Sequence, residues 1–181
     1  MLQEENKILA QISEGDENAY RKLFEHYYPK VRVFLSQFIA DSDDALDLAQ
    51  NIFIKIWLQR GNLMQIRSFG SFLYTMSRNA AIDYSRTHKI KIPLTEVPEK
   101  DCDGQETESV FYAKEIEVQV AHMIKGMPRK RREVFILSRL EGKSYAEISE
   151  ILGISRKTVE NHINLALKQL RKITTAIAIF I

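Results

Sequence analysis

The chain has 181 residues, of which 45% are hydrophobic and 28% are charged, and its formal net charge is +2. This composition indicates a globular protein of one large or two small domains. The single cysteine, Cys102, excludes an internal disulfide, and with 4 scattered histidines it gives no metal-ligand spacing. The sequence has no signal peptide and no apolar run near the roughly 20 residues of a membrane span, so we expect a cytoplasmic protein without metal or cofactor.

Basic and acidic side chains are segregated along the chain. Residues 1–60 have a net charge of −3 and residues 61–92 one of +4, whereas residues 93–117 have −6 and residues 118–181 have +7. Two basic blocks separated by an acidic one are expected when two surfaces meet a polyanion and the connector avoids it.

The first part of the chain has the pattern of a helical bundle. The whole sequence has only 4 prolines and 7 glycines and few alternating β-branched runs, which predicts an all-α fold. Apolar side chains recur at helical spacing after the capping residue Asp16, after the acidic run 41–44 and over 68–86. Helices of this length can close a core, so residues 1–86 are expected to form one small helical domain.

The predicted helix over residues 43–60 has two different faces. The arc that must face the domain core is apolar and consists of Ala45, Leu48, Ala49, Ile52, Phe53, Ile56 and Trp57. The opposite face sets two large aliphatic residues among polar ones and consists of Asp47, Gln50, Asn51, Ile54 and Leu58. An apolar centre with a polar rim is typical of a partner-binding surface. The alternative is that neighbouring helices cover Ile54 and Leu58.

A break in the helical period separates this domain from a second one. Residues 87–110 contain two prolines, a glycine and many acids, and we interpret them as a flexible linker. As a coil, such a segment would span about 27 Å root-mean-square and about 80 Å at full stretch. Residues 111–181 then form the second helical domain. Its apolar end, 173–181, is expected to be the end of the last helix or a small contact surface.

Residues 144–172 have the pattern of a DNA-binding helix-turn-helix. Ser144 and Glu147 fit a capping box, Gly153 fits the tight turn, and Ser155 fits the cap of a second helix. The inward stripe of that helix is Val159, Ile163, Ala166, Leu167 and Leu170. Its opposite face has amide and cationic groups that can reach base edges and phosphates, namely Lys157, Asn161, Asn164 and Lys168, with Glu160 and Arg171 at the edge. The alternative is an ordinary helical hairpin with a solvated face.

Three sequence segments, taken in chain order, carry a resemblance to a known protein family. They are DALDLAQNIFIKIW from Asp44, RNAAIDYSR from Arg78, and MPRKRREVFILSRLEGKSYAEISEILGISRKTVENHI from Met127. The first two resemble region 2, and the third resembles region 4, of bacterial sigma-70 family sigma factors of the extracytoplasmic-function (ECF) subfamily. The details are most similar to members from the Bacteroidetes. Asn51 stands where the family usually has an acid, and Met127 replaces its usual leucine.

The resemblance implies a non-enzymatic subunit of RNA polymerase. Its region 2 helix would dock on a coiled coil of the polymerase β′ subunit through Asp47, Gln50, Asn51 and Ile54. Residues that would melt the promoter −10 element and hold its unpaired strand are Tyr74, Arg78, Asn79 and Arg86. Region 4 would recognise the −35 duplex with Glu160, Asn161 and Asn164 toward bases and with Arg156, Lys157 and Lys168 toward phosphates. Members of this class are commonly silenced by an anti-sigma factor, which is frequently membrane-bound.

Other functional classes explain less of the sequence. A stand-alone helix-turn-helix regulator would account for the C-terminal domain, but it leaves the outer face of 43–60 and the basic segment 78–86 unexplained. An adaptor that makes protein contacts alone does not need a basic DNA-binding face. The chain has no nucleotide-binding loop and no catalytic triad, which disfavours an enzyme. The hypothesis that covers all three segments is a sigma factor that directs transcription initiation through −10 melting and −35 recognition.

Overall fold

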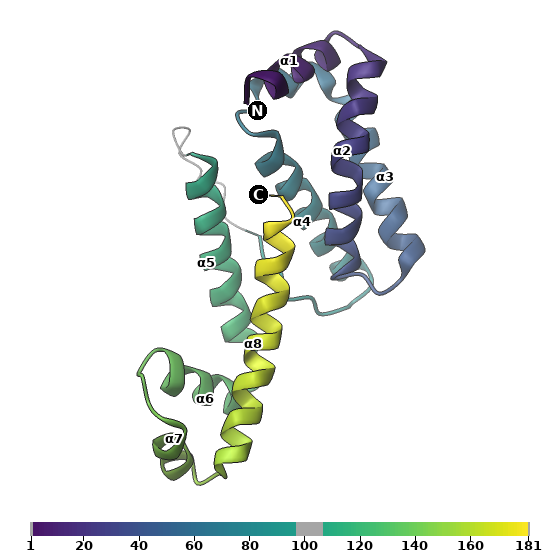
Figure 1. The fold of residues 1–181 in the computed structure, drawn as a ribbon. Coiled ribbons are helices and arrows are strands. Elements are labelled where there is room, and N and C mark those ends of the chain that lie inside the picture. Colours follow the sequence, from purple (N-terminus) through teal and green to yellow (C-terminus); the bar gives the residue numbers. More distant parts are fainter. Residues whose placement is uncertain (1, 97–106, 181) are drawn as a thin grey trace.

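The computed structural model describes residues 2–96 and 107–180, and within these ranges every regular element is helical (Figure 1). This result confirms the predicted all-α fold. In chain order the elements are α1 (Leu2–Ser13), α2 (Glu17–Ser36), α3 (Ser42–Leu58), the 3-10 helix η1 (Arg60–Gln65), α4 (Phe69–Thr87), α5 (Glu108–Gly126), α6 (Arg129–Arg139), α7 (Tyr145–Leu152) and α8 (Arg156–Ala178).

Polar side chains determine where the first helices begin. The Asp16 carboxylate accepts hydrogen bonds from the backbone N–H groups of Asn18 and Ala19, at 2.8 and 3.0 Å, and so caps α2. Asp41 caps α3, and the Ser68 hydroxyl caps α4. These contacts satisfy N–H groups that have no partner inside the helix. Between α3 and α4 the chain forms η1, which packs against α1.

The N-terminal bundle is built around α2, α3 and α4. The predicted inner arc of α3 faces this core, because Ala45, Ala49 and Ile52 are buried there. Aromatic rings join the helices, with the Phe24 and Phe53 rings 5.0 Å apart in an edge-to-face arrangement. On the outer face of α3, the side chains of Asp47, Gln50, Asn51, Ile54 and Leu58 are exposed.

The helix-turn-helix forms as the sequence predicts. Ser144 and Glu147 make the complete capping box of α7, and Gly153 ends that helix at φ 62°, in the left-handed region. Ser155 caps α8, whose Val159 and Ile163 are buried. The turn therefore fixes the N-terminal half of α8 beside α6 and α7, at the end of the molecule farthest from α1 (Figure 1).

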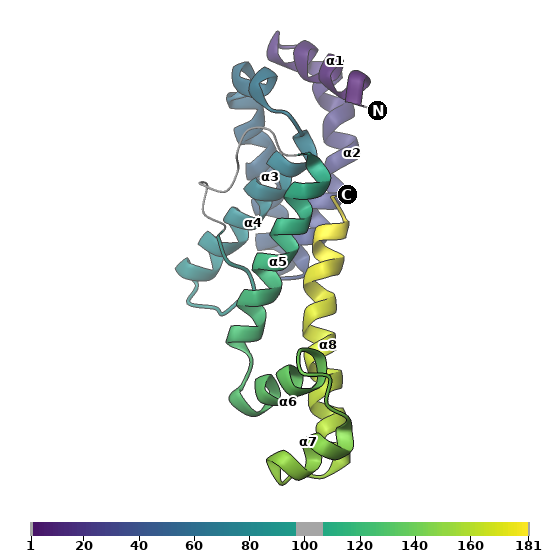
Figure 2. The ribbon, with the colours of Figure 1, turned by 90° about the vertical axis from the view of Figure 1, so that its left-hand side faces the viewer.

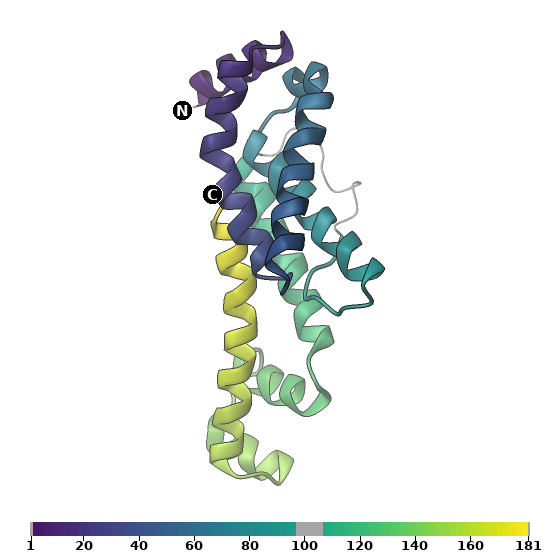
Figure 3. The ribbon, with the colours of Figure 1, turned by 90° about the vertical axis from the view of Figure 1, so that its right-hand side faces the viewer.

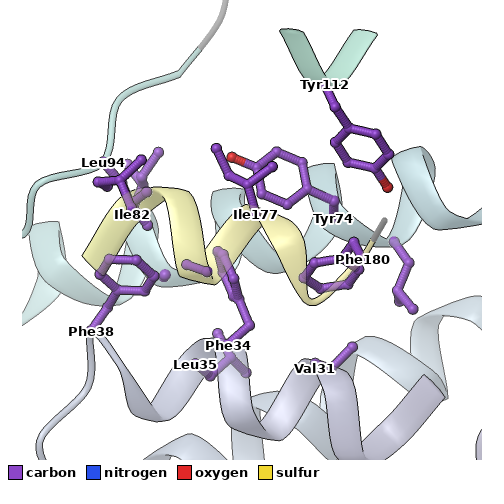
Figure 4. Close-up of a cluster of buried hydrophobic side chains, with 14 of the residues drawn as sticks. Val31, Phe34, Leu35, Phe38, Tyr74, Ile82, Leu94, Tyr112, Ile177 and Phe180 are labelled. Carbon is purple, nitrogen blue, oxygen red and sulfur yellow. The ribbon is translucent and has the colours of Figure 1, made fainter. Parts of the chain in front are cut away.

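The C-terminal half of α8 leaves the helix-turn-helix and packs into the N-terminal bundle. Ile173, Ala176, Ile177 and Phe180 are buried, and the Phe180 ring lies 5.5 Å from that of Phe34 on α2. Figure 4 shows Ile177 and Phe180 beside residues of α2 and α4. The predicted tail is therefore both the end of the last helix and a contact surface. The two halves of the chain share one hydrophobic core.

Helices and packed residues extend into both ends of the predicted linker. Helix α4 continues to Thr87 and α5 already begins at Glu108, while residues 97–106 and Cys102 within them lie outside the described residues. Before that gap the chain does not behave as a coil, because Leu94 is buried and Thr95 exchanges two hydrogen bonds with Gln119 of α5. Among the described helices, none is long and apolar enough to cross a membrane.

We predict that Gly153→Ala lowers the free energy of unfolding by about 1 kcal/mol, because a Cβ is strained at this positive φ. Gly61→Ala is the matched control, since no atom lies within 4 Å of a Cβ built there and its φ is not positive. Urea denaturation measures both. Equal stability of the two variants would contradict the role given to the turn.

Candidate nucleic-acid and partner interfaces

The outer face of α3 is an exposed surface with an apolar centre. Asp47, Gln50 and Asn51 are exposed, and Ile54 and Leu58 keep 54% and 71% of their surface in contact with solvent. The alternative that neighbouring helices cover the two aliphatic residues is therefore wrong for the part of the chain described. Helix α3 lies on the side of the bundle away from α5, as the opposed views of Figures 2 and 3 show.

The four residues predicted for the −10 strand all lie on α4, but their accessibilities differ. Tyr74 has no exposed surface and Arg78 has 4%, whereas Asn79 is half-buried and Arg86 is exposed. Tyr74 is not accessible for stacking on a base in this arrangement, because its ring lies among Phe34, Phe111 and Phe180. A tyrosine at helical spacing has here become a core residue.

Arg78 and Tyr74 both bind one carboxylate, that of Glu115 on α5. The Arg78 guanidinium forms a buried ion pair with Glu115, and the Tyr74 hydroxyl donates to the same oxygen at 3.1 Å. Burial, and then the charge of Glu115, raise the pKa of Tyr74. The other donors of Arg78, Nε and Nη2, reach Asn79 Oδ1 at 3.2 and 3.1 Å. Each of the three guanidinium nitrogens of the predicted DNA-binding arginine therefore has a partner within the protein.

The sequence analysis missed Glu115 and Gln119, both of which are buried on α5. Gln119 donates to Glu115 at 3.1 Å and to the backbone carbonyl of Thr95 at 2.7 Å. A signal was present, because the two polar residues lie four apart in the same helical stripe as the apolar Tyr112 and Met123. Polar residues in an apolar stripe indicate specific partners, because a buried polar group without one is costly.

An open cleft of about 1230 Å³ lies between α4, residues 90–96, α5 and α8. Its lining includes the cationic side chains Arg86, Lys91 and Lys172. Arg86 lies 3.0 Å from Glu96 and 3.5 Å from Asp83, and its side chain is 61% exposed. Ion pairs at such exposure are worth at most about 1 kcal/mol, so a phosphate can replace them.

The predicted −35 face lies on the N-terminal half of α8 and is accessible. Arg156, Lys157, Asn161, Asn164 and Lys168 are exposed. Glu160 is partly exposed, and its carboxylate accepts from Lys157 Nζ at 2.9 Å. The helix projects this face from the free end of the molecule, where α6 and α7 support it from behind (Figure 1). Amide and cationic groups on a supported, protruding helix can enter a DNA major groove. Within the described residues, no group of three or more His, Cys, Asp or Glu side chains could hold a metal ion.

Comparisons with known proteins identify the family of the chain. The family model for sigma-70 region 2 matches residues 23–90, and the model for sigma-70 region 4 matches residues 117–170. The RNA polymerase sigma factor SigZ of Bacillus subtilis is 30% identical over 83% of this chain and 84% of its own length. The ECF RNA polymerase sigma factor SigW of the same organism is 27% identical over 92% and 94%. A solved structure, CnrH in complex with the cytosolic domain of CnrY, is 20% identical, covers 94% of this chain and 97% of its own, and has a TM-score of 0.42. Both family models match the chain, and SigZ is 30% identical to it over most of the length of both proteins. The chain therefore belongs to the sigma-70 family and is an ECF sigma factor.

Proposed function

We propose that this protein binds core RNA polymerase and directs promoter-specific transcription initiation by melting the −10 element and recognising the −35 element. One observation carries the proposal. A single chain with both sigma-70 regions presents an outward face on α3, with exposed Ile54, and a polar, cationic face on α8. A stand-alone regulator of duplex DNA would need only the second face.

Core polymerase would bind the outer face of α3. Asp47, Gln50 and Asn51 surround Ile54 there, and all four are exposed. An exposed isoleucine is unfavourable in water but suits the desolvated centre of an interface. By the family resemblance, the surface it meets is a coiled coil of the β′ subunit.

Promoter DNA would meet α4 and α8. Arg78 and Arg86 would bind phosphates of the unpaired −10 strand, and Asn79 would bind a base edge. On α8, the side chains of Glu160, Asn161 and Asn164 would read bases, while Arg156, Lys157 and Lys168 would hold phosphates. In this proposal the functional units keep the predicted bounds, residues 1–86 and 111–181, with residues 87–110 as connector.

An anti-sigma factor, which in this family is frequently membrane-bound, is the further partner implied by the resemblance. We extend the proposal to such a partner and to an affinity with Bacteroidetes members, both on the resemblance of sequence alone. Co-purification from the native organism would identify this partner.

We expect Ile54→Asp and Asp47→Lys to weaken binding to core polymerase, by about 2 kcal/mol if they lie at the centre of the interface. Both sites are exposed, so the free energy of unfolding should change by no more than about 0.5 kcal/mol. Val33→Asp, at a 46% exposed site on α2, is the control. Co-purification with core enzyme and run-off transcription measure the effect. Holoenzyme formation by both variants at the wild-type level would refute the docking surface.

Asn161→Ala should lower transcription and relax base preference at one or two −35 positions, costing about 1–3 kcal/mol if the contact is bidentate. Lys168→Ala should instead weaken binding to all sequences and reduce the slope of its salt dependence by about 1. A promoter library transcribed by both holoenzymes separates these effects. Unchanged base preference in the Asn161 variant would remove this residue from the reading face.

Asn79→Ala should impair initiation on a fully paired promoter and change the preference for one −10 base. A pre-opened bubble should restore opening but not the base preference, because unpairing has been supplied while base readout has not. Run-off transcription on both templates, with permanganate footprinting, measures the two effects. Normal opening with normal preference would shift the assignment to the neighbouring segment 61–67.

A further inference from the structure

We propose that the free protein holds itself in a closed, autoinhibited state, in which Glu115 of α5 occupies the place of a DNA phosphate on Arg78. The inference rests on the proposed function for the meaning of Arg78, but the closed state itself can be measured without any transcription. Opening would be the step that makes the −10 surface available.

The Arg78–Glu115 contact connects segments on opposite sides of the linker. Both side chains are almost fully removed from solvent, with 5% and 2% of their surfaces exposed. Glu115 also accepts hydrogen bonds from Tyr74 and Gln119. Proteins bind a phosphate oxygen with the same kind of donors that surround this carboxylate. An incoming DNA strand and Glu115 would therefore compete for the same guanidinium.

Other interdomain contacts reinforce the same closure. The Ser68 hydroxyl at the start of α4 donates to Glu108 of α5 at 2.8 Å, and the Phe180 ring lies 5.5 Å from that of Tyr74. Gly70 permits this approach, because a Cβ there would lie 3.1 Å from Glu108 Oε1 and 3.5 Å from the Phe180 carbonyl oxygen. A large side chain at Gly70 would act as a wedge.

Closure affects the proposed surfaces unequally. Arg78 and Tyr74 are buried, and Asn79 is partly covered. The exposed face of α3 around Ile54 and the α8 face around Asn161 remain accessible. The closed protein could thus meet polymerase and duplex DNA, but it could not hold an unpaired strand until α5 and the end of α8 separate from α4.

The net charges of the two segments that carry the pair favour this contact. Glu115 belongs to the acidic block 93–117, which has a net charge of −6, and Arg78 to the basic block 61–92, which has +4. The acidic block is thus the intramolecular counterpart of the polyanion that the basic block is proposed to bind. If only a fraction of the protein is open, its apparent dissociation constant for single-stranded DNA rises by the inverse of that fraction.

The test uses the full chain with Cys102→Ser and dye labels at two exposed sites, Arg32→Cys on α2 and Glu150→Cys on α7. Single-molecule energy transfer should give one closed population for this parent.

Glu115→Arg, which places two positive charges beside each other, should produce a second, open population. The exchanged pair Arg78→Glu with Glu115→Arg should restore closure. Gly70→Leu should open the chain without changing any charge. Glu117→Arg, at an exposed site on the same helix, is the matched charge control and should stay closed.

The same proteins are then titrated with a fluorescent single-stranded oligonucleotide of mixed sequence. Glu115→Arg and Gly70→Leu should bind it about tenfold or more tightly than their references, Glu117→Arg and the parent, because a larger fraction is open. An open parent, an exchanged pair that stays open, or equal affinities across the set would each overturn the proposal. Failure of the parent to support run-off transcription with core polymerase would instead overturn the proposed function and leave the energy-transfer result standing.

Discussion

The burial of Arg78 is the constraint on which the arrangement of the two halves depends. A guanidinium removed from water must have an anionic partner and further hydrogen-bond acceptors, and it finds them in Glu115 and Asn79. Removing one member of such a pair typically costs about 3–5 kcal/mol, because the remaining charge stays buried. In the proposed open state that cost would be relieved in a second way, since separation of α5 from α4 would return both groups to solvent. The pair is therefore suited to a contact that opens and closes.

The hydrophobic packing around the pair also joins the two halves of the chain. Tyr74 and Phe34 of the N-terminal bundle face Phe180, at the end of the chain, with ring centroids 5.5 Å apart in each case. The closed form thus buries apolar surface from both halves in one core, which favours it in water (Figure 4). When the halves separate, these aromatic residues would be exposed together with Arg78. Stacking on a base, which the closed form denies to Tyr74, would then become available to it.

Two kinds of surface are combined in this ECF sigma factor. The faces around Ile54 and Asn161 stand on regular helices whose opposite sides are packed, and both are already exposed to the partners proposed for them. The face around Arg78 is available only in a different arrangement of the chain. In the proposed closed state, Glu115, one of the acidic residues that were expected to avoid DNA, pairs with Arg78 and so competes with DNA for the proposed binding surface.

Local features of this protein were determined by the sequence alone. Three of them are the capping box of Ser144 and Glu147, the left-handed Gly153 and the outward position of Ile54. Each depends on residues within a few helical turns of one another, so the sequence pattern predicts it. The fate of Tyr74 and Arg78 depended instead on α5, whose Glu115 lies 37 residues beyond Arg78 along the chain. Helical periodicity gives the direction in which a side chain points but not the helix that will meet it. Only the tertiary structure decided that the predicted strand-binding face of α4 would be covered, because covering it required helices from the far side of the linker.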